Sequence, residues 1–139
     1  MTELDRVKGI VNAYIAAVHE LMRRKPWSDG LLGLGKLPGR DAVHERYYAL
    51  LREEIAVAAG SGLAEQEVFA ICAFLLRAEK ELGASPMIRT MLIAFQCLTA
   101  SLIPLLTQKH REELLHYLET SCPPQRRLPC QNEIIKLLR

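Results

Sequence analysis

The segment from residue 30 to residue 40, GLLGLGKLPGR, comes close to a nucleotide-binding loop. Gly30, Gly35 and Lys36 match the spacing G-x-x-x-x-G-K-[ST], in which backbone amides and the lysine hold phosphate groups. The hydroxyl position that would hold magnesium is Leu37, and a proline follows it, so no helix can begin at the lysine. No strand precedes the segment either. We therefore predict no nucleotide site here.

A Glu-x-x-His pair, Glu113 and His116, matches half of the pattern that di-metal helical bundles use. Such a site needs its carboxylates on the inward faces of the helices. Leu114 and Leu118 define the inward face of this helix, which directs Glu113 and His116 toward water. The most apolar predicted helices carry no acidic residue in their middle parts. We therefore predict no metal site.

The four cysteines differ in their surroundings. Cys72 and Cys97 lie in apolar runs, where a free thiol behaves as a small hydrophobic group. Cys122 and Cys130 flank the segment CPPQRRLPC, whose length allows a loop disulfide without requiring one. No C-x-x-C pair suggests zinc. The amino-terminal residues MTELDRVKG do not resemble a secretory signal, so we expect reduced thiols and a cytoplasmic protein.

Nucleophilic catalysis would require a cysteine and a histidine to meet in space. Cys122 and Cys130 follow a helix that carries His110 and His116, but no catalytic signature surrounds either cysteine. We therefore predict a protein that is not an enzyme and that uses no cofactor.

The whole chain shows a helical period and no strand pattern. We predict an all-α fold, a compact bundle of five to six helices with a Gly-rich apolar loop between helices 1 and 2. Residues 1–139 form one helical domain, of which 121–139 are a Pro-rich linker and a short C-terminal helix. The expected helices span residues 3–25, 42–59, 64–82, 86–103, 108–120 and 132–139.

The first expected helix has an apolar seam at alternating spacings of three and four residues. Its members are Leu4, Val7, Val11, Tyr14, Val18 and Leu21. Thr2 is suited to cap its N-terminus, and Asp41 is suited to cap the next helix. His19 and His44 are isolated histidines on amphipathic helices, and we expect both at the surface or at its boundary.

The third and fourth expected helices are apolar over most of their circumference, and a chain of 139 residues has difficulty enclosing two such helices. Small residues on the fourth helix would permit close approach of another chain: Ala94, Cys97, Ala100 and Ser101. We predict a homodimer, or a hydrophobic groove for a partner helix. The alternative is a monomer in which the last two helices cover the apolar faces.

Residues 90–107 contain no charge and reach the lower length limit of a membrane span. Gln96 and Pro104 reduce the hydrophobicity of this run, and its neighbours are amphipathic. We therefore predict a buried helix, and we do not expect a membrane as a partner.

The loop 26–40 is unusually apolar for a connecting segment. Its large side chains include Trp27, Leu31, Leu34 and Leu37. They either fold back as a lid over the end of the bundle or form part of a partner surface with Trp27 as an anchor.

These observations favour a non-catalytic protein–protein interaction module, a regulator, adaptor or inhibitor that acts through apolar helix surfaces. One alternative is a bundle that binds a small apolar ligand, with Gln96, Cys97 and Thr99 as its polar contacts. Another is a nucleic-acid-associated regulator that uses the basic residues at positions 23–25 and Arg40. The formal net charge of only +2 argues against nucleic acid as the partner.

Overall fold

The computed structural model describes residues 2–24 and 39–139. Within these ranges the chain is all-α, with six α-helices and no strand, and the predicted fold class is confirmed. The helices are α1 (Glu3–Arg24), α3 (Arg40–Gly60), α4 (Glu65–Leu82), α5 (Pro86–Cys97), α6 (Gln108–Ser121) and α7 (Pro129–Leu138). Short 3-10 turns follow α5 at Leu98–Ser101 and Ile103–Leu105, and another lies at Pro124–Arg126. Residues 26–38 of the predicted Gly-rich loop fall outside the described ranges.

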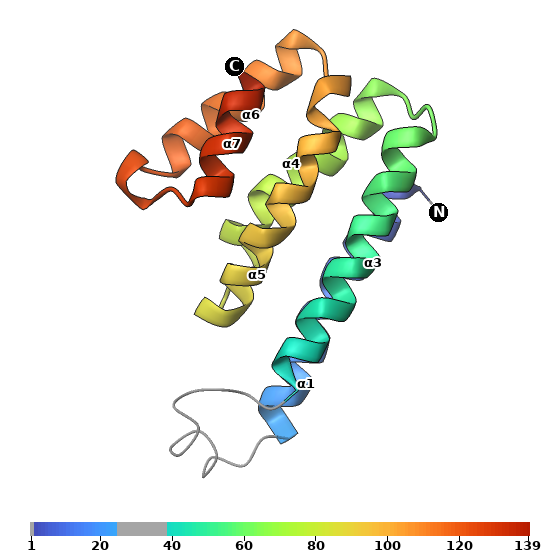
Figure 1. Cartoon of the computed structure of the whole chain (residues 1–139), viewed down its shortest axis with the longest axis vertical. Helices are drawn as coiled ribbons and strands as arrows, with labels where there is room; N and C mark the ends of the chain where they lie inside the picture. The colour runs from blue at the N-terminus through green and yellow to red at the C-terminus, as the bar shows by residue number, and fades with distance from the viewer. Residues whose placement is uncertain (1, 25–38) are drawn as a thin grey trace.

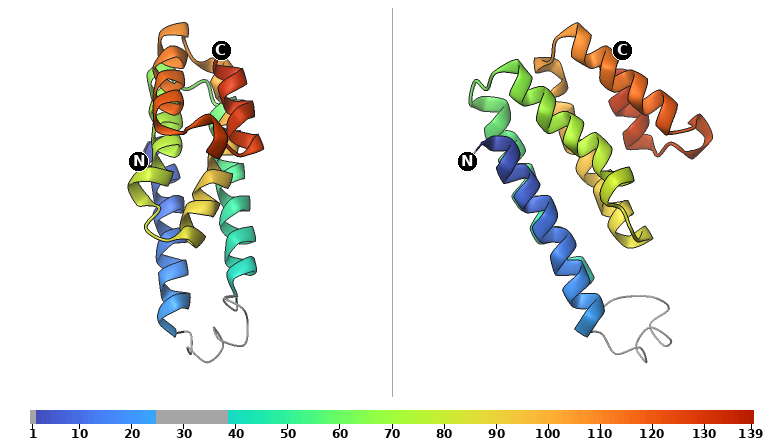
Figure 2. Two further views of the ribbon diagram at one scale, coloured as in Figure 1. Left: turned by 90° about the vertical axis from the view of Figure 1, so that its left-hand side faces the viewer. Right: turned by 180° about the vertical axis from the view of Figure 1, so that it is seen from behind.

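The helices form three pairs that stack side by side. Figure 1 shows the α4–α5 pair between the α1–α3 pair and the α6–α7 pair, and the view from behind in Figure 2 shows the same order. Accordingly, α4 packs on both α1 and α6, while α5 packs on α3 and α7. The middle pair is therefore covered on two sides.

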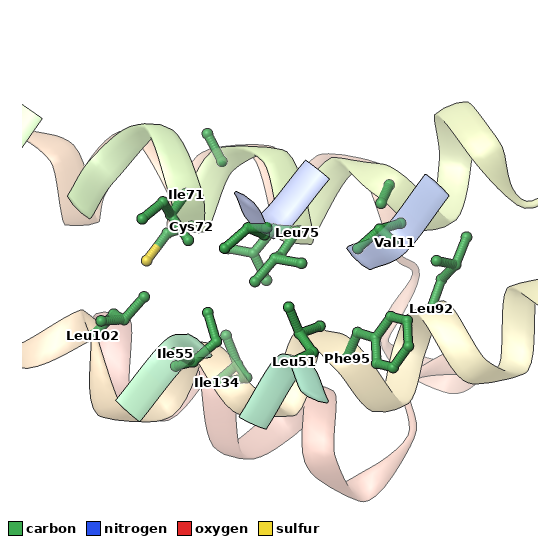
Figure 3. Packing of buried hydrophobic residues seen from close by; sticks show 14 of the residues in the cluster. Val11, Leu51, Ile55, Ile71, Cys72, Leu75, Leu92, Phe95, Leu102 and Ile134 are labelled. Atoms are coloured by element: carbon green, nitrogen blue, oxygen red, sulfur yellow. The ribbon is translucent and has the colours of Figure 1, made fainter. Parts of the chain in front are cut away.

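This position explains why the sequences of α4 and α5 are apolar around most of their circumference. Ile71, Cys72 and Leu75 of α4 and Leu92 and Phe95 of α5 are almost completely buried in one continuous core (Figure 3). Side chains from the outer pairs complete that core. Within the described residues, the chain's own helices, including the last two, cover the apolar surfaces of α4 and α5. This is the arrangement that the monomer alternative expects.

The middle of the predicted α1 seam is buried. Val7, Val11, Tyr14 and Val18 are all fully inaccessible, while Leu4 and Leu21 at its two ends are half-buried. The Tyr14 hydroxyl lies 2.9 Å from Nε2 of His44 on α3. Burial raises the pKa of Tyr14 to about 12, and burial followed by the Arg40 charge lowers the pKa of His44, so the bond joins two neutral groups. His44 is half-buried at the α1–α3 boundary, where we expected it.

Two predicted helix boundaries differ from the structure by three residues or more. The α-helical part of α5 ends at Cys97 and not at residue 103, because 3-10 turns replace it on the approach to Pro104, which has no amide hydrogen to donate. The hydroxyl of Thr99 also donates to the Gln96 carbonyl at 2.7 Å. At the C-terminus, α7 begins at Pro129 rather than 132, since proline suits the first turn of a helix.

The start of α3 is set by a glycine. Gly39 adopts a left-handed conformation with φ of 84° and precedes the helix, whereas Asp41 lies inside its first turn and makes no cap. A Cβ at residue 39 would also lie 3.3 Å from the Leu21 side chain. The prediction that Asp41 caps this helix is therefore wrong, because the backbone turn uses the freedom of glycine instead.

Two carboxyl groups face each other where α1 meets α3. Arg6 Nη1 lies 3.1 Å from Glu3 Oε1 and 3.7 Å from Glu54 Oε1. Two neighbouring carboxyls repel each other when both are charged, and a proton shared between them relieves this repulsion. The interaction with Glu3, followed by burial, raises the pKa of Glu54. The stabilisation from the shared proton is complete below the unfolded-state pKa and is lost as the pH rises through the folded-state pKa.

We predict that Glu54→Gln stabilises the protein at neutral pH, because the amide donates to Glu3 without adding a second negative charge. The gain should be at most about 1 kcal/mol, because the site is partly solvated, and it should disappear near pH 4, where the native pair shares a proton. Thermal unfolding measured from pH 4 to pH 8 tests this. Glu53→Gln, at an exposed position of the same helix, serves as the control. If the difference in stability between Glu54→Gln and the native chain is the same at every pH, the two carboxyls do not share a proton.

Candidate functional site

Two adjacent residue pairs join α5 to α7. Cys97 and Cys130 form a disulfide with their Cα atoms 5.9 Å apart. Beside it, Nε2 of Gln131 donates to Oε1 of Gln96 at 3.3 Å, and Nε2 of Gln96 donates to the Leu76 carbonyl of α4, also at 3.3 Å. Both glutamines are buried. We call Gln96, Cys97, Cys130 and Gln131 the α5–α7 joint.

The cysteine predictions are only partly confirmed. Cys72 is a buried free thiol, its sulfur points into the core in Figure 3, and burial raises its pKa to about 12. The prediction of a free thiol at Cys97 is wrong, and Cys130 pairs with it rather than with Cys122. The reason is the packing of α7 on α5, which brings together residues 33 positions apart. Cys122 remains a free, half-buried thiol.

A cavity of about 290 Å³ lies beside the α5–α7 joint, between the middle helix pair and the α6–α7 pair. Its walls come from the C-terminal part of α4, from α5, from the segment after α6 and from α7. The lining residues are Glu79, Lys80, Arg89, Ile93, Ser121, Cys122, Pro123, Arg126 and Gln131.

The cavity is electrically positive. Lys80, Arg89 and Arg126 line it against a single carboxylate, Glu79. In the described part of the chain, none of these three cations forms an ion pair within 4.0 Å. Arg89 Nη2 donates to the Gly83 carbonyl at 3.3 Å, which holds its guanidinium at the rim. Cationic groups that form no ion pair within the protein attract carboxylates and other anions.

The segment between α6 and α7 is held in place by its own hydrogen bonds. Oε1 of Gln131 accepts the Leu128 amide at 3.0 Å and the Cys122 thiol at 3.8 Å. Arg127 Nε donates to the Cys122 carbonyl at 2.9 Å. This segment therefore fixes one wall of the cavity. Its sequence, CPPQRRLPC, is a local signal of the site, but the pattern suggested a loop disulfide or a cysteine nucleophile and gave no indication of a cavity.

The predicted partner-binding residues fall into two groups. Ala94, Cys97 and Ala100 are half-buried and Ser101 is exposed, so these four do not form one open face. The Ser101 hydroxyl donates to the Leu98 carbonyl at 3.3 Å. The other group, Trp27, Leu31, Leu34 and Leu37, lies outside the described residues.

The polar groups expected to contact an apolar ligand are engaged within the protein. Gln96 and Thr99 are buried, and each is hydrogen-bonded to the chain itself. Cys97 is in the disulfide. These three residues consolidate the packing of α5, and their hydrogen-bonding groups do not point into an open space.

The Glu-x-x-His pair lies where its helix periodicity predicts. Glu113 and His116 are both exposed, and no group of three or more His, Cys, Asp or Glu residues within the described ranges could hold a metal ion. Across residues 2–24 and 39–139, no helix is long and apolar enough to cross a membrane.

His110 has a structural role that the sequence did not reveal. Its Nδ1 lies 2.7 Å from Oε2 of Glu65, and its ring stacks on Phe69 with a centroid distance of 3.8 Å. Glu65 also accepts the Thr107 amide at 2.8 Å, and this bond, followed by the His110 contact, lowers the pKa of Glu65. These contacts tie the first turn of α4 to the first turn of α6.

Comparison with known proteins returns no relative. No protein-family model matches the chain, and neither a curated protein nor a solved structure matches it. The geometry of the cavity and of the α5–α7 joint is therefore the basis for a functional proposal.

We predict that removing the disulfide by Cys97→Ser together with Cys130→Ser lowers the free energy of unfolding by about 3–4 kcal/mol, because the crosslink restricts the unfolded chain. Urea unfolding measures the change. Cys122→Ser is the matched control and should cost less than about 1 kcal/mol, because that thiol makes only one weak contact. Equal losses in the two proteins would contradict a stabilising role for the crosslink.

Proposed function

We propose that this chain is a non-catalytic interaction protein that binds an acidic segment of a partner protein in the cationic cavity. The observation that supports this most directly is the set of three cations, Lys80, Arg89 and Arg126, which line a defined hollow without internal ion pairs in the described residues. All three residues are exposed to solvent, and a carboxylate-bearing segment would bring charges opposite to theirs.

The size of the cavity favours a short insertion. About 290 Å³ lies at the lower end of the range for ligand pockets, roughly 300–1,000 Å³. A pocket of this size admits one or two acidic side chains and does not admit a helix. The contact is therefore charge recognition by a small cavity, and it differs from the apolar helix docking that the sequence favours.

Self-association remains a prediction with little support from the described surface. The exposed large hydrophobic residues are scattered over several elements: Met22, Leu50, Val57, Leu105, Leu128 and Leu137. Single exposed apolar side chains of this kind occur on monomeric proteins and require no partner. A dimer would have to use these scattered positions or the segment outside the described residues.

Nucleic acid is the less favoured partner. Arg23 pairs with Glu20, and Arg40 Nε lies 3.5 Å from an Asp41 oxygen, so two of the basic residues considered for this role have acidic neighbours. A nucleic-acid surface needs a broad positive field, whereas Lys80, Arg89 and Arg126 line one small hollow.

The disulfide bears on the location of the protein. The cytoplasmic location predicted from the sequence depended on reduced thiols, and the Cys97–Cys130 bond removes that support. Because disulfides persist mainly in oxidising surroundings, we propose an oxidising compartment as the place where the cavity has the shape described.

A charge-reversal experiment tests the proposal. We expect fluorescein-labelled hexaglutamate to bind with an affinity that falls as salt rises, measured by fluorescence anisotropy. Lys80→Glu with Arg126→Glu should weaken binding about tenfold or more, because two attractions become repulsions. Lys109→Glu with Lys136→Glu changes the net charge equally at exposed positions away from the cavity and should have a much smaller effect.

Two outcomes of this experiment contradict the proposal. One is equal weakening by the two double variants, which would indicate attraction to net charge alone. The other is tighter binding of a labelled single-stranded oligonucleotide of the same charge, which would favour nucleic acid. Hexaglutamine, which has the same length and no charge, should not bind.

A further inference from the structure

The cavity contains a nucleophile that the proposed recognition of acidic segments does not use. Cys122 lines the hollow as a half-buried free thiol. The other free thiol among the described residues, Cys72, is fully buried in the core, and burial raises its pKa to about 12. The remaining two cysteines are paired with each other. Cys122 is thus the thiol that a small reagent can reach.

The groups around Cys122 are suited to bringing an anion to its sulfur. Lys80, Arg89 and Arg126 share the cavity with it, and Ile93 and Pro123 supply an apolar wall. The Cys122 thiol donates to Oε1 of Gln131 at 3.8 Å, and the residue is half-buried. Thiols that react selectively occur in such electropositive, partly exposed surroundings.

From this arrangement we infer that the cavity is a site of mixed-disulfide formation, in which Cys122 reacts with a small disulfide that carries carboxylates. This inference deepens the proposed function, since the same three cations hold the carboxylates in both cases. The occupant is anionic because the cavity is cationic, and small because the hollow measures about 290 Å³.

The reaction is a thiol–disulfide exchange that balances without an added oxidant. Cys122 loses its proton to solvent, and its thiolate sulfur attacks one sulfur of the bound disulfide. A new bond forms between Cys122 and that sulfur, while the original sulfur–sulfur bond breaks. The other half of the reagent departs with the electron pair as a free thiolate. The adduct then fills the cavity and competes with an acidic segment of a partner.

The reaction is distinct from the existing crosslink. The Cys97–Cys130 bond lies in the α5–α7 joint, where Cys97 and Cys130 are each half-buried and near the Ile93 carbonyl, with sulfur-to-oxygen distances of 3.6 Å and 3.8 Å. If Cys122 instead attacked that crosslink, the reagent would end on Cys97 or Cys130 or would be released. The residue that carries the adduct therefore shows which of the two reactions has occurred.

Three disulfides of similar size and different charge test the inference: dithiodiglycolate, which is anionic, hydroxyethyl disulfide, which is neutral, and cystamine, which is cationic. The rate of adduct formation is measured by mass spectrometry after acid quenching, and peptide mapping locates the adduct. Each rate is divided by the rate for the same chain unfolded in urea, which removes the intrinsic reactivity of the reagent.

We expect the normalised rate to be about tenfold higher for dithiodiglycolate than for cystamine at low salt, with the neutral reagent between them. The ratio of the normalised rates for dithiodiglycolate and cystamine should fall toward one in high salt and in the double variant Lys80→Gln with Arg126→Gln. The control Lys109→Gln with Lys136→Gln should retain it. The adduct should map to Cys122, and Cys122→Ser should form none.

Equal normalised rates for the three reagents would overturn the inference, as would a native Cys122 that none of them modifies, or an adduct on Cys97 or Cys130. Hexaglutamate binding to the native, unmodified protein distinguishes failure of this inference from failure of the proposed function. Normal peptide binding without a charge preference in the exchange reaction rejects the thiol site alone. A charge preference without peptide binding rejects the acidic partner alone.

Discussion

The pairing of two buried amides beside a disulfide fixes the position of the last helix. Gln96 and Gln131 are almost fully buried. A buried amide without hydrogen-bond partners destabilises the fold. The bond between the two amides and the bond from Gln96 to the Leu76 carbonyl therefore favour one placement of α7 on α5. The Cys97–Cys130 bond holds the adjacent positions covalently. A shift of α7 by one turn would break both pairs, so the cavity beside them depends on this joint.

The order of the three helix pairs explains the polar character of the candidate site. Because α4 and α5 lie between the outer pairs, their apolar side chains are used within the core (Figures 1 and 3). The last pair is short, and the cavity forms where its connecting segment meets the ends of α4 and α5. At that junction the chain presents charged and polar groups, which is why the recognition we propose is electrostatic.

Local patterns in the sequence predicted most of the helices. The seam Val7, Val11, Tyr14 and Val18 is buried as its spacing required, and Glu113 and His116 are exposed as theirs required. These features depend on helical periodicity, which neighbouring residues determine. The end of α5 at Cys97 was harder to predict, because a 3-10 turn there satisfies the same hydrophobic pattern as an α-helix.

The site itself depends on contacts between distant parts of the chain. The three cations of the cavity come from α4, α5 and the segment after α6, and no motif connects Lys80, Arg89 and Arg126 in the sequence. Likewise, the spacing of four cysteines does not specify their pairing; the sequence allowed a Cys122–Cys130 loop disulfide without requiring it, and the expectation was reduced thiols, whereas Cys97 pairs with Cys130. Only the packing of α7 on α5 determines both features.

In our proposal the α5–α7 joint shapes a cavity that receives acidic groups. This can be tested by nuclear magnetic resonance spectra of the ¹⁵N-labelled protein, recorded during titration with hexaglutamate before and after reduction of the disulfide. We expect shifts confined to amides of residues 79–93 and 121–131 in the oxidised protein, and much smaller shifts after reduction. Shifts centred on α1 or α3, or the same response in both redox states, would contradict it.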